Sequence, residues 1–241
     1  MSVLFAYPGQ GAQRPGMLAA LPDEPPVRAC LEQAADCLGQ APAELESAEA
    51  LHGTRAVQLC LLIAGVAASR LLETRGHRPG LVAGLSIGAY PAAVVAGALD
   101  FDDALRLVAL RGELMQAAWP EGSGLHCALL DEPAARLAEA FAGIRLHRPR
   151  VPYLSSSRAR LVAEPAALAD DLAGNMARRV EWLATLRSAY ERGARLHLEL
   201  PPGRVLSGLA RPLFGCATPA FEGSRADTLD ALLREEEKRT R

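Results

Sequence analysis

Short apolar runs alternate with longer amphipathic segments along most of the chain. Strand-like apolar runs occupy residues 2–7, 81–84, 151–154 and 195–200. Segments with apolar residues at helical spacing lie between and after them, at residues 27–38, 54–75, 91–99, 101–118, 132–141, 166–176, 180–192 and 227–238. Strands that alternate with helices are typical of an α/β fold. The pattern therefore predicts a mainly parallel sheet flanked by helices, with a charged, solvated helix at 227–238.

The apolar runs also bear on targeting. Residues 1–5 lack the basic segment and the extended apolar segment of a signal peptide. We expect no apolar run to reach membrane-spanning length. The five cysteines form no CxxC pair, which fits reduced thiols and gives no metal-ligand spacing. The sequence thus predicts a cytoplasmic protein with no membrane contact and no bound metal.

Composition narrows the class further. Half of the 241 residues are apolar, 22% are charged, and the formal net charge is −2. These values are ordinary for a globular chain and argue against a disordered or a nucleic-acid-binding protein. The length is sufficient for a substantial core in one domain.

The most informative stretch is residues 81–90, which read Leu-Val-Ala-Gly-Leu-Ser-Ile-Gly-Ala-Tyr. Gly84, Ser86 and Gly88 form a Gly-x-Ser-x-Gly motif between a predicted strand and a predicted helix, which is the context of a nucleophile elbow. A Cβ at either glycine would clash in so tight a turn. We expect Ser86 Oγ to project into solvent, with the Ile87 N–H placed to stabilise an oxyanion. The alternative is an ordinary Gly-rich turn with an incidental serine.

A nucleophilic serine needs a base, and spacing alone does not choose among five histidines. His126 follows a Gly-rich break at 122–124 and precedes a helix, so it fits a loop mouth. His197 lies in an apolar run and fits a packed or edge position. The other three fall in polar loops where we expect them to be solvated: His52, His77 and His147.

Several motifs together resemble one known family. Residues 8–13 (Pro-Gly-Gln-Gly-Ala-Gln), 84–88 and 110–116 (Leu-Arg-Gly-Glu-Leu-Met-Gln) look like the three signature stretches of malonyl-CoA:acyl-carrier-protein transacylases, in the family's order. Residues 126–130, 175–182 and 199–208 resemble its later parts. The resemblance runs from about residue 3 to residue 215. Within the family, the motif around Ser86 and residues 54–60 look closest to the transacylase (epsilon) subunit of malonate decarboxylase.

The resemblance implies a mechanism by acyl transfer. Ser86 would become a malonyl ester, and His126 would carry the proton between the serine and the thiols. Asn175 matches the position whose backbone carbonyl orients that histidine, which gives its side chain a minor role. The substrate would be malonyl-CoA and the partner an acyl-carrier protein with a phosphopantetheine-type thiol. No tightly bound cofactor is implied.

Substrate binding follows from the same comparison. The N–H groups of Gln10 and Ile87 would form the oxyanion hole. Arg111 would hold the free malonyl carboxylate with its planar guanidinium, and Gln58 would line the pocket. Without the resemblance, Arg111 reads more simply as a helix-surface arginine in a salt bridge.

The chain departs from the family pattern in two places. Leu85 stands where many members have a histidine. Only residues 119–125 separate the arginine helix from His126, where the family carries a small ferredoxin-like subdomain. We therefore expect a single α/β-hydrolase-like core over residues 1–241, with a deletion junction at 119–125. A naturally minimal member is the alternative. The deletion would be expected to leave the site open to water.

Two other functions are compatible with the same residues. A serine hydrolase or thioesterase would need an acidic residue and a histidine after Ser86 in triad order, with His197 as the later histidine candidate in a strand. A catalytically weak module that docks a carrier protein would keep the core without forming an acyl-serine. Arg111 distinguishes the malonyltransferase from the hydrolase, because it should slow the reaction of acyl groups that lack a carboxylate.

Overall fold

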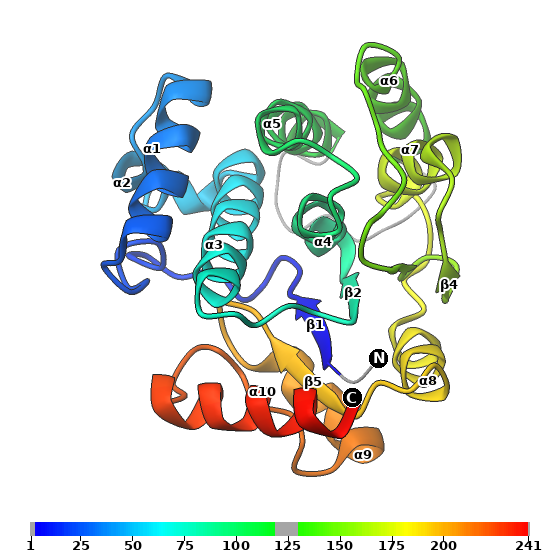
Figure 1. The fold of residues 1–241 in the computed structure, drawn as a ribbon. Helices are drawn as coiled ribbons and strands as arrows, with labels where there is room; N and C mark the ends of the chain where they lie inside the picture. The colour runs from blue at the N-terminus through cyan, green and yellow to red at the C-terminus, as the bar shows by residue number, and fades with distance from the viewer. Residues whose placement is uncertain (1–2, 119–129, 241) are drawn as a thin grey trace.

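The computed structural model describes residues 3–118 and 130–240, and its centre is a five-stranded sheet (Figure 1). The strands are β1 (Val3–Tyr7), β2 (Leu81–Gly84), β3 (Tyr153–Ser155), β4 (Arg160–Leu161) and β5 (Leu196–Glu199), in the order β4-β3-β2-β1-β5. The first three strands and β5 pair in parallel, and β4 pairs antiparallel to β3. The predicted α/β fold with a mainly parallel sheet is confirmed.

Ten α-helices of the described ranges surround this sheet. They are α1 (Pro25–Leu38), α2 (Pro42–Leu45), α3 (Thr54–Thr74), α4 (Ala89–Val95), α5 (Phe101–Ala118), α6 (Asp131–Phe141), α7 (Pro165–Gly174), α8 (Trp182–Glu191), α9 (Val205–Phe214) and α10 (Ala226–Thr240). Two short 3₁₀ helices, η1 (Ala50–His52) and η2 (Ser86–Gly88), precede α3 and α4.

The sheet is buried on both faces, and alternate residues of β1 divide between two hydrophobic clusters. Val3, Phe5 and Tyr7 belong to the larger cluster, which contains α3, α4 and α5. Leu4 and Ala6 belong to the smaller one, which contains residues of α8 and α9. Figure 1 shows α3, α4 and α5 together above the strands and α8 and α9 at the opposite side. Near-continuous apolar strands are what a doubly covered parallel sheet requires.

Helix α3 corrects one expectation from the sequence. By length and composition alone it is apolar enough to cross a membrane. However, 89% of its most apolar window is buried inside the protein, where it packs against α1, α4 and α5. A core helix that is covered on all sides needs apolar residues around its whole circumference, which accounts for the composition.

Other differences lie at element boundaries and in the C-terminal third. The predicted helix at 91–99 ends at Val95 and is preceded by η2. Strand β4 and helix α9 were not predicted: β4 has only two residues, and Pro212 stands inside α9, where proline is rare. His77 is buried rather than solvated, because α10 packs over it and places Asp230 and Glu237 within 3.2 Å and 3.1 Å of its ring nitrogens.

Candidate active site

The nucleophile elbow forms where β2 ends beside β1. Tyr7 pairs with Gly84, and the Leu85 N–H donates to the Tyr7 carbonyl at 2.9 Å. The next residue, Ser86, has a φ of +54°, in the left-handed region that non-glycine residues rarely adopt. Such a conformation costs on the order of 1–3 kcal/mol and persists only where the surroundings enforce it. The strain falls on the residue that the motif marks as the nucleophile.

The two glycines of the motif are required by close backbone approaches. A Cβ on Gly84 would overlap the Gly88 carbonyl, and a Cβ on Gly88 would overlap the Tyr7 carbonyl. The turn therefore presses the end of η2 against both central strands. Ser86 is 8% exposed, so its side chain lies in a nearly closed site rather than projecting into open solvent.

Arg111 lies beside Ser86, although it comes from a different element. Its Nη2 donates to Ser86 Oγ at 3.2 Å. Helix α5 can approach α3 closely here because Gly112 has no side chain: a Cβ at this position would lie 2.9 Å from the Arg55 backbone nitrogen. The close approach brings Arg111 Nη1 to 2.6 Å from Gln58 Oε1 on α3.

The interpretation of Arg111 as a helix-surface residue is wrong, because the side chain is 0% exposed. Burial lowers the pKa of its guanidinium to about 10, with the Tyr90 hydroxyl opposing the shift, so the group stays protonated at neutral pH. Nε is buried without a hydrogen-bond partner among the described residues. The site thus holds a desolvated cation next to the serine, and the Nε–H of this cation is available to donate a further hydrogen bond.

Asn175 completes this group of side chains. It follows α7, whose position is fixed in part by the Tyr90 hydroxyl donating to the Leu172 carbonyl at 3.0 Å. Its Oδ1 accepts from Arg111 Nη2 at 3.1 Å, and its Nδ2 donates to the Ser86 carbonyl at 3.3 Å. The sequence interpretation gave the Asn175 side chain a minor role. The structure instead places it in contact with both the cation and the elbow.

The Gly-rich turn after β1 lies next to the elbow. A Cβ on Gly9 would lie 2.5 Å from Leu85 Cδ2 and 2.9 Å from the Leu85 carbonyl oxygen, so the turn rests directly on the residue before Ser86. Gln10 is exposed and Ile87 is fully buried, and each belongs to one of these two touching segments. This arrangement brings the proposed oxyanion donors to the same edge of the sheet.

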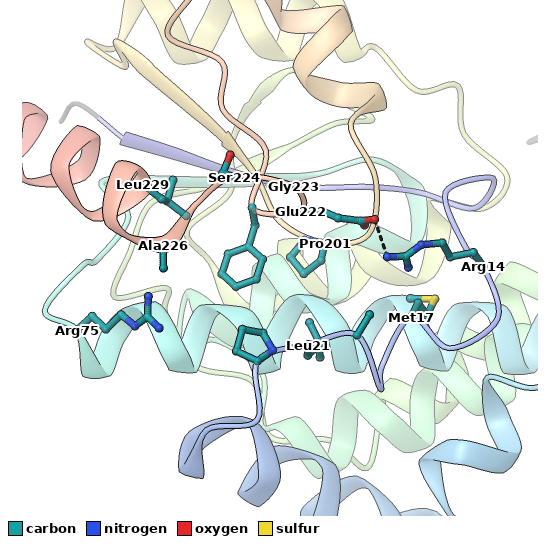
Figure 2. Close-up of a pocket in the computed structure, with 13 residues that line it drawn as sticks. Arg14, Met17, Leu21, Arg75, Pro201, Glu222, Gly223, Ser224, Ala226 and Leu229 are labelled. Atoms are coloured by element: carbon teal, nitrogen blue, oxygen red, sulfur yellow. Dashed lines mark hydrogen bonds and ion pairs between the residues drawn. The ribbon is translucent and has the colours of Figure 1, made fainter.

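An ion pair ties this turn to the C-terminal part of the chain. Arg14 donates to Glu222 at 2.6 Å, and the other carboxylate oxygen of Glu222 accepts from the Gly203 N–H at 2.7 Å. Figure 2 shows the Arg14–Glu222 pair at one end of a cavity of about 210 Å³ with Met17 and Leu21 among its apolar walls. Arg75 lies at its other end, paired with Glu24. Both arginines already have carboxylate partners.

Comparison with known proteins now adds to this geometry. The model of the acyl transferase domain matches residues 4–136, more than half of the chain. The chain belongs to the acyl transferase domain family. A malonyl CoA-acyl carrier protein transacylase of Salmonella typhimurium is 28% identical over 288 residues, covering 89% of this chain and 93% of the relative. A Bacillus subtilis protein of the same name is 36% identical over 141 residues, 57% of this chain and 44% of that one.

Solved acyl transferase structures show the same fold. An acyl-carrier-protein S-malonyltransferase from Burkholderia pseudomallei matches with a TM-score of 0.88 and 26% identity, covering 97% of this chain and 100% of that one. A malonyl-transacylase solved in complex with a type II polyketide acyl-carrier protein matches with a TM-score of 0.87 and 28% identity, covering 98% and 100%.

The predicted base, His126, falls outside the described part of the chain. His126 and the break at 119–125 both belong to the undescribed residues 119–129, so the role of His126 stays a prediction. The rival base, His197, is described: it lies on β5, with β1 between it and the elbow strand. Neither of its ring nitrogens has a partner among the described residues, and its ring packs 5.8 Å from that of Phe214. This position does not suit a hydrolase triad with Ser86.

Within residues 3–118 and 130–240, no group of three or more His, Cys, Asp and Glu side chains is arranged to hold a metal ion. The described polar groups around Ser86 are instead one guanidinium and two amides. This donor set fits an anionic organic group: the guanidinium matches a carboxylate, and the elbow presents a hydroxyl for acyl transfer.

Proposed function

We propose that this acyl transferase moves a malonyl group from malonyl-CoA to the thiol of an acyl-carrier protein through an ester on Ser86. The observation that carries the proposal is the contact between Arg111 and Ser86. A fully buried guanidinium forms no ion pair with any described residue, yet lies 3.2 Å from the nucleophilic oxygen. Buried arginines are normally paired, so an acyl group with its own carboxylate would supply the missing partner.

The short distance also limits the length of the acyl chain. In a malonyl group the carboxylate carbon is two bonds from the thioester carbonyl carbon. Arg111 Nη2 and Ser86 Oγ are within hydrogen-bond distance of each other. A group that satisfies both must therefore carry its carboxylate close to its carbonyl, as malonyl does and longer dicarboxylic acyl groups do not. Acetyl would leave Arg111 without a carboxylate.

The transfer takes two half-reactions. In the first, Ser86 Oγ attacks the thioester carbonyl while His126 accepts the hydroxyl proton; the carbon–sulfur bond breaks, and the proton passes to the CoA thiolate. In the second, His126 accepts the proton of the carrier thiol, the sulfur attacks the malonyl ester, and the proton returns to Ser86 Oγ. The N–H groups of Gln10 and Ile87 would stabilise the oxyanion of each tetrahedral intermediate.

The acceptor is inferred from the relatives. One similar structure is a malonyl-transacylase bound to its acyl-carrier protein, and several relatives carry the acceptor in their names. The phosphopantetheine-type thiol is the group that such a carrier would present. A place in malonate decarboxylase is the finer form of the proposal, and it rests on the resemblance around Ser86 and at residues 54–60.

We also propose that residues 119–125 mark the loss of the small ferredoxin-like subdomain. The alignment with the Salmonella typhimurium relative extends over 288 positions and is therefore longer than this 241-residue chain. The relative must then contain residues with no counterpart here. This supports a single core domain with a shortened connection between α5 and α6.

Intact-protein mass spectrometry after incubation with malonyl-CoA, and separately with acetyl-CoA, tests the proposed function. We expect a malonyl adduct on the wild-type chain and none on Ser86→Ala. Arg111→Ala should lower the rate of malonyl adduct formation by about 100-fold or more, because it removes the carboxylate's partner, and should leave acetyl transfer much less affected.

The same experiment separates the alternatives. A thioesterase would release acyl groups to water without preference for malonyl. A docking module would form no adduct, and the Ser86→Ala substitution would leave its affinity for the carrier protein unchanged. Either result would contradict the proposed function.

A further inference from the structure

The side chains that hold Arg111 are both neutral amides. Gln58 Oε1, on α3, accepts from Nη1 at 2.6 Å, and Asn175 Oδ1, after α7, accepts from Nη2 at 3.1 Å. The two amides are themselves buried, at 0% and 3% exposure. One approaches the guanidinium from α3 and the other from the end of α7, so two neutral groups fix its position, and no described carboxylate forms an ion pair with it.

The orientation of both amides follows from chemistry. An Arg guanidinium can only donate, so each amide must turn its oxygen toward it. The remaining amide groups then donate in directions that the structure satisfies: Gln58 Nε2 toward Met115 Sδ at 3.2 Å and Asn175 Nδ2 toward the Ser86 carbonyl at 3.3 Å. A carboxylate at either position would lose that second donor and form an ion pair with Arg111.

The choice between amide and carboxylate decides how much charge the site keeps. An amide dipole holds the guanidinium but leaves its full positive charge, whereas a carboxylate would cancel it in a desolvated environment where charges interact strongly. We propose that Gln58 and Asn175 set the acyl specificity of this site, because two neutral amides keep the charge of Arg111 uncompensated until a substrate carboxylate binds. This inference rests on the proposed function and assigns the origin of its selectivity.

Asn175 has a second task that Gln58 does not share. Its amide bridges the guanidinium and the backbone carbonyl of the nucleophile, so one side chain fixes the position of the cation relative to the elbow. A substrate must span the distance between the guanidinium and Ser86, with its carboxylate at the first and its carbonyl at the second. Asn175 is thus a positioning residue for both ends of the acyl group.

The test replaces the amide with a carboxylate of the same shape. Initial rates of adduct formation are measured by intact-protein mass spectrometry for wild type and Gln58→Glu, with malonyl-CoA and with acetyl-CoA. We expect the malonyl-to-acetyl rate ratio to fall by about tenfold or more in Gln58→Glu, because the new carboxylate neutralises Arg111 and repels the malonyl carboxylate.

Gln58→Met is the matched control, since it removes the hydrogen bond to Arg111 without adding charge. We expect it to keep the preference for malonyl. Asn175→Asp applies the same charge change from the other helix and serves as the second test if Gln58→Glu does not fold, as judged by circular dichroism.

The outcomes separate the inference from the function beneath it. A wild-type chain with no preference for malonyl would contradict the proposed function itself. A wild-type preference that survives in both Gln58→Glu and Asn175→Asp would overturn only the role given to the amides. An equal loss of preference in Gln58→Met and Gln58→Glu would also overturn it, because the hydrogen bond rather than the charge would then be responsible.

Discussion

His197 is a polar residue in a wholly apolar environment. Its side chain is 0% exposed on β5, and neither ring nitrogen has a partner in the described part of the chain. Burial lowers the pKa of His197 to about 4, because the charged imidazolium would lose its hydration. The folded protein therefore holds this ring in its neutral form, whereas the unfolded chain binds a proton near pH 6.5.

This difference predicts an acid-dependent loss of stability. Between pH 6.5 and pH 4 the unfolded state binds a proton that the folded state does not, so stability is complete above this range and falls as pH decreases through it. For wild type, His197 should cost about 2 kcal/mol of unfolding free energy at pH 5 relative to pH 7. In His197→Leu that contribution should disappear, as measured by urea denaturation at both pH values.

The exposed His147 provides the control, since His147→Leu should keep the wild-type pH dependence. An unchanged pH dependence in His197→Leu would show that other groups dominate the acid response.

At the same scale, the sequence identified Ser86 and Arg111 but not the contacts between them. The Gly-x-Ser-x-Gly motif marks the nucleophile because a tight turn needs glycines at fixed positions. The network through Asn175 joins residues that are 64 and 89 positions apart, and no local pattern encodes such a contact. Without the family resemblance, the sequence also places Arg111 on the helix surface, because its burial depends on the approach of α3, which the small residue Gly112 permits.

Among the elements, α10 shows how a charged helix can still be part of the core. Leu229 and Leu233 are buried in the larger hydrophobic cluster, while the neighbouring Leu232 is 42% exposed. The helix also covers His77. The sequence predicted a solvated helix because charges dominate its composition, but one apolar stripe is enough to dock it.

Two neighbouring leucines of α10 give a matched test. Leu233→Ala should lower the free energy of unfolding by about 2–4 kcal/mol, because it removes buried methyl groups and leaves a cavity. Leu232→Ala should change it by about 0.5 kcal/mol or less, since the side chain already meets water. Chemical denaturation of both variants measures the difference. Equal effects would indicate that α10 is not docked as the structure describes.

Most helices and the parallel strands were predictable, because each has a long periodic signal or a short apolar run with turn residues beside it. The short strand β4 and helix α9 were not. Strand β4 has two residues, and it exists because it pairs with β3. The first turn of helix α9 is capped by the buried carboxylate of Glu199, which accepts from the Leu206 and Ser207 N–H groups at 3.0 Å and 2.6 Å. A cap contributed from the end of a strand is visible only in three dimensions.

At the scale of the whole molecule, Glu222 connects distant parts of the chain at the active-site edge of the sheet. It joins Arg14, 208 positions away, to the backbone of Gly203. Arg14 lies four residues after Gln10, so this contact anchors the turn that carries a proposed oxyanion donor. Both partners of the ion pair are partly exposed, at 43% for Arg14 and 31% for Glu222. An exposed pair adds little to global stability.

The contacts of Glu222 with Arg14 and Gly203 should therefore affect the rate of malonyl transfer more than the stability of the fold. We expect Glu222→Gln to lower the rate of malonyl adduct formation about tenfold, because the turn that carries Gln10 loses its anchor. Its melting temperature should fall by no more than a few degrees. Quenched time courses analysed by mass spectrometry measure the rate of adduct formation, and a thermal melt measures the melting temperature. A large loss of stability without loss of rate would assign Glu222 to the fold alone.

The order of strands in the sheet also determines how long β1 lacks one of its partners during synthesis. Strand β1 lies between β2 and β5, and synthesis must pass through more than 100 residues after β2 before β5 appears. At about 5–20 residues per second, one edge of β1 waits on the order of ten seconds for its partner. An unpaired, wholly apolar strand is prone to pair with other chains. The central strand beside the turn that carries Ser86 is therefore the part of the sheet most exposed to wrong pairing during synthesis.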